Sequence, residues 1–146
     1  RRVLFRSPNQ NPESPYSGVI SILVDRYKKI QKGEDTHFTL FGDGSQSRDF
    51  VFIEDVIQAL LLVASKEESL GKQFNVGTGN AITLNELIEV IDETLGIKLA
   101  LKHESERDGD IKDSVADISR LKGLGYNPNF SVQEGMKKYL VSEELI

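Results

Sequence analysis

Residues 73–103, QFNVGTGNAITLNELIEVIDETLGIKLALKH, decide the fold class. They predict a core strand in QFNVG, a glycine turn, a helix, and a second strand in KLALKH. The helix is the clearest local pattern, because Thr83 and Glu86 form a capping box and Gly96 supplies its end. Its apolar stripe consists of Leu84, Leu87, Ile88, Ile91 and Leu95. The order strand, helix, strand indicates an α/β protein and argues against a sandwich or a helical bundle.

The same alternation continues on both sides of this stretch. Helices are expected over residues 19–30, 54–64, 117–122 and 132–140, and extended segments over 37–41 and 48–53. The apolar face of the second helix is predicted to be Val56, Ile57, Leu60, Leu61 and Ala64. The last helix begins with a second capping box, formed by Ser131 and Glu134. Together these segments predict a small mixed sheet with helices, of the kind found in a lobe that completes a larger fold.

The composition is that of one soluble globular domain. The chain has 146 residues, of which 38% are hydrophobic and 28% are charged. Its formal net charge of -5 is spread along the sequence, which argues against a surface for nucleic acid or for an anionic membrane. No apolar run approaches the roughly 20 residues of a membrane span. Because the chain contains no cysteine, disulfides and thiolate metal sites are excluded, and a reducing cytoplasm is the default compartment.

Two arginines are the strongest candidates for chemistry. His37 and His103 lie in predicted strands without the spacing of a metal site, and the glycine turns lack the rest of a phosphate-binding fingerprint. Arg48 directly follows a tight turn, and Arg107 lies in a charged loop. Their guanidinium groups suit a diphosphate, which they would bind in bidentate geometry. The alternative is that they form surface ion pairs with the aspartates beside them, and spacing alone favours that alternative.

Four ordered segments resemble a known family. They are PNQNPESPYSGVI at 8–20, FGDGSQSRDFVFIEDV at 41–56, FNVGTGNAITLNEL at 74–87 and RDGDIKDSVADISRLKGLGYNP at 107–128. In order and separation they resemble the UDP-glucose 4-epimerase and UDP-N-acetylglucosamine 4-epimerase family of extended short-chain dehydrogenases/reductases. The match covers nearly everything after residue 7, so residues 1–7 stand apart as a foreign or frayed segment.

The resemblance implies an NAD-dependent enzyme built in two parts. A Rossmann-type N-terminal domain would hold NAD, and a C-terminal lobe, here residues 8–146, would grip the UDP of a UDP-sugar. In such enzymes the nicotinamide takes hydride from sugar C4, the 4-keto sugar rotates, and hydride returns to its other face. A sugar that must turn over cannot be clamped, so binding energy has to come from the nucleotide and the diphosphate. Family members are commonly homodimers.

The resemblance also assigns the border of the pocket. Gln10 and the stretch from Tyr16 to Val19 would lie beside the nucleotide sugar. One strand would address the uracil edge through its backbone groups: Thr39, Leu40 and Phe41.

The diphosphate and sugar positions follow from the same resemblance. Arg48 and Arg107 look like the diphosphate clamp, and Asp110 resembles the acid that meets the uridine ribose. In this family the seventh residue after the second arginine borders the sugar, where a tyrosine restricts the pocket and a small residue leaves room. Ser114 holds that position and therefore predicts tolerance of a 2-acetamido group.

Departures from the family pattern limit what this chain does by itself. The run from Arg6 to Gln10 stands where the family has aromatic-Gly-Pro-Arg-Gln. The Gly-rich NAD loop and the Tyr-x-x-x-Lys pair are absent from these 146 residues, so no catalytic or cofactor-binding residue is assigned and the isolated chain is expected to be inactive. Two alternatives stay open. One is the lobe of a related nucleotide-sugar dehydratase, decarboxylase or reductase, and the other is a catalytically silent nucleotide-sugar binding module.

Overall fold

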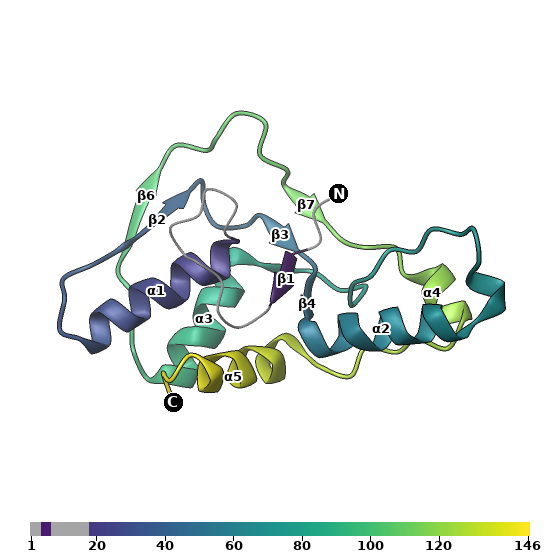
Figure 1. Cartoon of the computed structure of the whole chain (residues 1–146). Helices are drawn as coiled ribbons and strands as arrows, with labels where there is room; N and C mark the ends of the chain where they lie inside the picture. Colours follow the sequence, from purple (N-terminus) through teal and green to yellow (C-terminus); the bar gives the residue numbers. More distant parts are fainter. Residues whose placement is uncertain (1–3, 7–17) are drawn as a thin grey trace.

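The structure, a computed structural model, describes residues 4–6 and 18–146. Helices and strands alternate along the chain, which confirms the predicted α/β class (Figure 1). The helices are α1 (Val19–Gln31), α2 (Ile53–Ser65), α3 (Leu84–Leu95), α4 (Ser119–Gly123) and α5 (Val132–Ser142), with a 3-10 turn η1 (Glu67–Ser69). The strands are β1 (Leu4–Arg6), β2 (Phe38–Phe41), β3 (Ser47–Arg48), β4 (Phe50–Phe52), β5 (Ile82–Thr83), β6 (Leu101–Glu104) and β7 (Asp113–Ser114).

Across residues 4–6 and 18–146, the strands form three small sheets instead of one. β1 pairs with β4, and β2 pairs with β6, both in parallel. In the third sheet β3 lies between β5, to which it is antiparallel, and β7, to which it is parallel. The expected small mixed sheet is thus divided, and division leaves strand edges whose backbone groups can bind a ligand.

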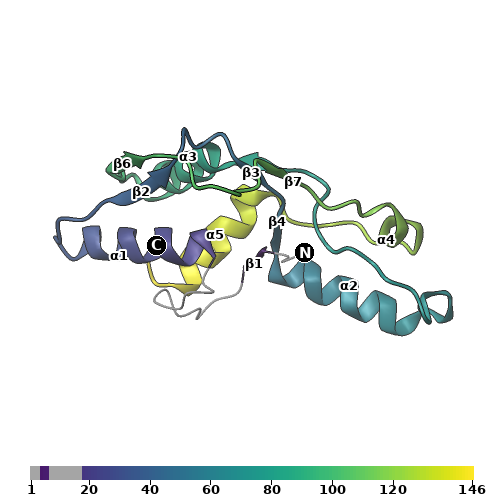
Figure 2. The same cartoon turned by 90° about the horizontal axis from the view of Figure 1, so that it is seen from above.

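The main core lies where α1, α3 and α5 gather, at the opposite end from α2 and α4, as both views show (Figure 1, Figure 2). Its largest fully buried side chains are Leu23, Tyr27, Leu40, Leu87, Ile91, Met136 and Leu140. The Tyr27 hydroxyl donates to Oδ1 of Asp92 at 2.6 Å and so joins α1 to α3. Burial, with this hydrogen bond, raises the pKa of Tyr27 well above its ordinary value.

Helix α3 confirms the capping prediction. Oγ1 of Thr83 accepts a hydrogen bond from the Glu86 amide at 3.1 Å, and the Glu86 carboxylate accepts one from the Thr83 amide at 2.7 Å. Gly96 ends the helix in the left-handed region, with φ of 64°. The stripe is buried as predicted at Leu84, Leu87, Ile88 and Ile91. Ser131 and Glu134 form the same reciprocal box at the start of α5.

The predicted apolar face of α2 is buried within the described residues only at Val56. Three of its large side chains lie in solvent: Ile57 is 47%, Leu60 62% and Leu61 67% exposed. Ala64 is exposed as well, and the side chains that α2 buries are Asp55, Val56 and Ala59. The reason is Asp55, whose carboxylate accepts hydrogen bonds from the amides of Asn129 and Phe130 at 2.7 and 3.3 Å. This buried acid turns its own side of the helix inward.

The strand predicted over residues 73–77 is wrong, since no strand of the described residues pairs with this segment. Side chains hold it in place instead. The Asn75 amide donates to the Asp117 carbonyl at 3.1 Å, and the Tyr126 hydroxyl donates to the Gly77 carbonyl at 3.0 Å. Phe74 and Val76 pack against a second, smaller cluster, which comprises Ala59, Ile118, Leu121 and Tyr126. The segment therefore ties α2 to α4 without a ladder of backbone bonds.

Candidate functional site

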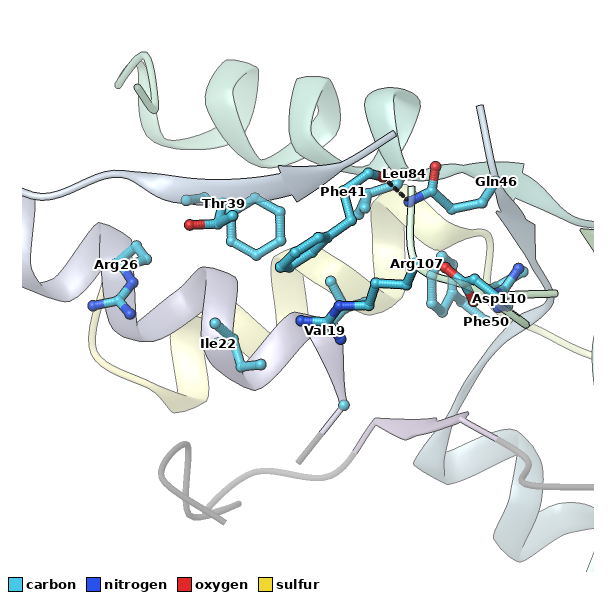
Figure 3. Close-up of a pocket in the computed structure, with 13 residues that line it drawn as sticks. Val19, Ile22, Arg26, Thr39, Phe41, Gln46, Phe50, Leu84, Arg107 and Asp110 are labelled. Atoms are coloured by element: carbon cyan, nitrogen blue, oxygen red, sulfur yellow. Dashed lines mark hydrogen bonds and ion pairs between the residues drawn. The ribbon is translucent and has the colours of Figure 1, made fainter. Parts of the chain in front are cut away.

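A pocket of about 450 Å³ lies between α1 and β2. Its wall comes from Gly18, Val19, Ile22 and Arg26 on the α1 side, and from Phe38, Thr39, Phe41 and Gln46 on the β2 side. Phe50, Leu84, Arg48, Arg107 and Asp110 complete the lining. Arg107 and Asp110 lie at one end of the pocket (Figure 3), and Arg48 joins them there through its ion pair with Asp110. A few convergent polar groups on an apolar wall are typical of a small-molecule site.

One edge of β2 faces this pocket without a partner strand among the described residues. The Phe38 amide donates to Ala100 at 2.9 Å and the Gly42 amide to Glu104 at 3.0 Å, so the even-numbered residues bond toward β6. In a parallel ladder the residues between them point the other way. Thr39 and Phe41 therefore turn their amides and carbonyls toward an edge that no strand among residues 4–6 and 18–146 covers. This edge offers a carbonyl and an amide side by side to a planar ring.

Arg107 covers the ring of Phe41. Its guanidinium carbon lies 3.6 Å from the ring centroid, and Figure 3 shows the side chain reaching over the ring from its loop. This is a cation–π contact of close geometry. The backbone carbonyl of Phe41 accepts a hydrogen bond from Nε2 of Gln46 at 3.1 Å. The aromatic face and the cation thus belong to one surface of the pocket.

Arg48 reaches the same end of the pocket from β3. Its Nη1 donates to the carbonyls of Ser47 and Lys112 at 2.7 and 3.2 Å, and its Nη2 lies 3.0 Å from Oδ1 of Asp110. The Arg48 side chain is 22% exposed and that of Asp110 36%. The two carbonyls fix the guanidinium plane through Nη1, while the carboxylate pairs with Nη2.

Asp49 anchors the strand that carries Arg48. Its carboxylate accepts hydrogen bonds from the Thr78 amide and hydroxyl at 2.9 and 2.7 Å, from the Gly79 amide at 3.0 Å and from the Ala116 amide at 3.3 Å. A carboxylate with several amide donors is a strong local anchor. It joins β3 to the glycine turn and to the segment after β7.

The glycine turn at residues 77–79 does not fit the diphosphate of a dinucleotide. A dinucleotide loop binds phosphate with free amides at a helix N-terminus. Here the amides of Thr78 and Gly79 are bonded to Asp49, and the start of α3 is closed by its capping box. The described residues thus offer no NAD site at this turn, and the pocket beside β2 is the candidate site for a ligand.

Six of the ten residues named from the sequence line that pocket: Val19, Thr39, Phe41, Arg48, Arg107 and Asp110. Leu40 lies on the other side of β2, with its side chain fully buried. Ser114 lies on β7 directly opposite Arg48 in the strand register, beside the pocket and outside its lining. Gln10 and Tyr16 fall outside the described residues.

Arg26 and Gln46 were missed. Arg26 lies on the α1 face of Val19 and Ile22, and the spacing of these positions is the signal that could have found it. Its Nε is buried without a hydrogen-bond partner among the described residues. Gln46 is part of a glycine-containing turn, and its side chain belongs to no periodic pattern that would mark it.

Comparisons with known proteins show which family this chain resembles. Residues 4–77 match the family described as "NAD dependent epimerase/dehydratase family". A putative UDP-glucose 4-epimerase of Methanocaldococcus jannaschii is 33% identical over 129 residues, which are 88% of this chain and 39% of that protein. A probable GDP-L-fucose synthase of rice is 25% identical over 88% of the chain and 39% of its own length. The chain thus spans about two fifths of these relatives.

Solved structures give the same fold. The UDP-glucose 4-epimerase of Thermotoga maritima with UDP-glucose superposes with a TM-score of 0.78 at 30% identity, over 96% of this chain and 43% of that one. The UDP-N-acetylglucosamine 4-epimerase of Methanobrevibacter ruminantium, in complex with UDP-N-acetylmuramic acid, has a TM-score of 0.78 at 32% identity, over 95% and 44%. No helix among residues 18–146 is long and apolar enough to cross a bilayer.

Proposed function

The chain belongs to the NAD-dependent epimerase/dehydratase family, and from that premise we propose that residues 8–146 are the UDP-binding lobe of a UDP-sugar 4-epimerase. One observation carries the proposal. The open edge of β2, the Phe41 ring and the two arginines face a single pocket of about 450 Å³. That volume lies within the range of ordinary small-ligand sites, about 300–1,000 Å³.

Each part of UDP has a complementary group in this pocket. Uracil has an N–H donor between two carbonyl acceptors, so the Thr39 carbonyl would accept from N3 and the Phe41 amide would donate to the neighbouring oxygen. The base would stack on the Phe41 ring, and the diphosphate would take the guanidinium groups of Arg48 and Arg107. Asp110 would accept from a ribose hydroxyl. The sugar beyond the diphosphate stays loosely held, as an epimerisation that turns it over requires.

NAD would be bound by another part of the whole protein. The family is NAD dependent, and bound NAD supplies the hydride chemistry at sugar C4. The amides of the glycine turn are bonded to Asp49, so this lobe contributes position and not redox chemistry. The exposed apolar face of α2 supports a second domain packed against the lobe.

Titration of the chain with UDP, followed by amide NMR shifts, tests the proposal. We expect millimolar binding, with shifts at Thr39, Phe41 and Arg107 and none at Arg120, which lies on α4 at the far end. Arg48→Gln and Arg107→Gln should each weaken UDP about tenfold or more, because each removes charge-assisted hydrogen bonds. Arg120→Gln is the matched control. An intact fold with no shifts at millimolar UDP rejects the proposal.

The similarity to a GDP-L-fucose synthase supports one alternative, the lobe of a related nucleotide-sugar enzyme. The base decides between them. Cytosine carries an acceptor at N3 and would face the Thr39 carbonyl with no hydrogen between them, which costs about tenfold or more in affinity. We therefore expect UDP to bind more tightly than CDP, whereas guanine, which has an N1–H donor beside its O6 acceptor, can meet the same two backbone groups. A preference for GDP would favour the alternative.

A further inference from the structure

Both cations at the diphosphate end of the pocket already have a partner inside the protein. Nη2 of Arg48 lies 3.0 Å from Oδ1 of Asp110. The guanidinium of Arg107 lies 3.6 Å from the centroid of the Phe41 ring. All four side chains line the pocket, so each pair blocks a surface that a ligand would need.

Asp110 and Phe41 suit different parts of a ligand from those that the two arginines suit. Asp110 is an acceptor and suits a hydroxyl donor, whereas the Phe41 ring suits a flat base. Arg48 and Arg107 suit phosphate oxygens. A nucleoside diphosphate can give all four groups a new partner at once. Pyrophosphate or a nucleoside alone can satisfy only two of them.

We propose that Asp110 is a specificity residue that makes the pocket reject simple phosphates and accept a diphosphate joined to a nucleoside. This rests on the proposed function of the pocket. Pyrophosphate would displace the Asp110 carboxylate from Arg48 and then lie beside it, with like charges close together and no hydroxyl to bind the acid. The ribose of a nucleoside diphosphate supplies that hydroxyl.

The turn at residues 107–110 links the two pairs. The Asp110 amide donates to the Arg107 carbonyl at 3.1 Å, and Gly109 takes the positive φ of 79° that closes the turn. One member of each pair is therefore carried by the same short turn. A shift of this turn that separates Asp110 from Arg48 also moves Arg107 on the Phe41 ring, so the two exchanges are coupled.

Amide NMR titrations of the 146-residue chain with UDP, with inorganic pyrophosphate and with uridine test this inference. In the unsubstituted chain we expect UDP to bind at least tenfold more tightly than pyrophosphate, and more tightly than the separate affinities of pyrophosphate and uridine together imply. Asp110→Asn should raise the pyrophosphate affinity roughly three- to fivefold, the scale of an exposed ion pair, and should lower the UDP affinity. Asp110→Ala should act in the same direction.

Asp108→Asn is the matched control, because it removes the same charge from the same loop and Asp108 bonds to no described residue. It should leave the ratio of UDP to pyrophosphate affinity nearly unchanged. Equal gains of pyrophosphate binding in Asp108→Asn and Asp110→Asn would reduce the effect to net charge and overturn the inference. If UDP itself fails to bind, the proposed function falls; if UDP binds but Asp110→Asn leaves the ratio in place, only the role of Asp110 falls.

Discussion

The carboxylate of Asp49 accepts hydrogen bonds from both the amide and the hydroxyl of Thr78, at 2.9 and 2.7 Å. Asp49→Asn replaces one acceptor oxygen by an NH2 group. That group would point at the donors of Thr78, or at the backbone amides of Gly79 and Ala116, and could not accept their hydrogen bonds. We expect the free energy of unfolding to fall by about 1–3 kcal/mol, the cost of leaving a partly buried polar group unpaired. Urea denaturation followed by circular dichroism measures this loss.

The control for Asp49 is Asp35→Asn, at an exposed aspartate on the loop before β2. It should change the free energy of unfolding by less than about 0.5 kcal/mol, as surface substitutions usually do. Since Asp49 directly follows Arg48, Asp49→Asn should also weaken UDP binding. Equal stability of the two variants would show that the hydrogen bonds accepted by the Asp49 carboxylate contribute little.

Gly77 is required by a close approach and not by its φ angle. A Cβ built on Gly77 would lie 2.5 Å from Oδ2 of Asp49 and 2.7 Å from Cβ of Ala116. Gly77→Ala should therefore destabilise the fold by about 1–3 kcal/mol, the usual cost of overpacking. Gly123→Ala is the matched substitution, since a Cβ there meets nothing within 4 Å. It should be neutral or stabilise α4 by about 1 kcal/mol, and a thermal melt that ranks the two the other way contradicts the geometry.

What the sequence predicted well is local. The capping box of Thr83 and the apolar stripe of α3 depend on neighbours within a few residues, so their pattern is complete in the sequence. The differences at α2 and at residues 73–77 come from tertiary partners, because Asp55 finds its donors at Asn129 and Phe130, far along the chain. A buried aspartate with hydrogen-bond partners can decide which side of a helix faces the core, and the periodicity of the sequence does not predict its burial.

The site divides in the same way. Sequence spacing indicated that Arg48 and Arg107 are unusual, but it could not predict that they lie in the same pocket. The family resemblance predicted that they do. Arg26 and Gln46 stayed hidden because a pocket wall is made by elements that meet only in three dimensions. Ion pairs between each arginine and its neighbouring aspartate, the alternative to phosphate binding, are not what the described residues show: Asp49 accepts hydrogen bonds from Thr78, and Arg48 forms its ion pair with Asp110, 62 residues along the chain. That ion pair becomes part of the proposed specificity.

The outer face of α2 should tolerate polar residues that the core does not. Leu61 is 67% exposed, so Leu61→Gln should change the free energy of unfolding by less than about 0.5 kcal/mol. Leu87 is fully buried, and Leu87→Ala should cost about 2–5 kcal/mol through lost burial and a residual cavity. Chemical denaturation of both variants measures the contrast. A comparable cost at Leu61 would mean that this face is covered within the chain.

Ser114 should govern the size of the accepted sugar. It lies opposite Arg48 in the register of β3 and β7, so a large side chain there would stand beside the diphosphate end of the pocket. In the whole enzyme, Ser114→Tyr should lose activity on UDP-N-acetylglucosamine by tenfold or more on the scale of a steric clash, while activity on UDP-glucose is retained. Kinetics on both substrates measure the ratio, and unchanged selectivity would refute the role of Ser114. Ser119→Tyr, at an exposed serine of α4, is the control.

Acid should weaken the fold through its two capping boxes. Hydrogen bonds from the Thr83 amide and hydroxyl hold the pKa of Glu86 below its ordinary value of 4.5, and those from the Ser131 hydroxyl and amide do the same for Glu134. A carboxyl whose pKa is lowered in the folded state stabilises above its unfolded pKa, and that contribution is lost as the pH falls through the folded value. The urea midpoint should thus decline below about pH 4.5. The double variant Glu86→Gln with Glu134→Gln should lower the urea midpoint at pH 7 and make its decline in acid less steep. Glu89→Gln, at an exposed site on α3, is the control and should leave the steepness of that decline unchanged.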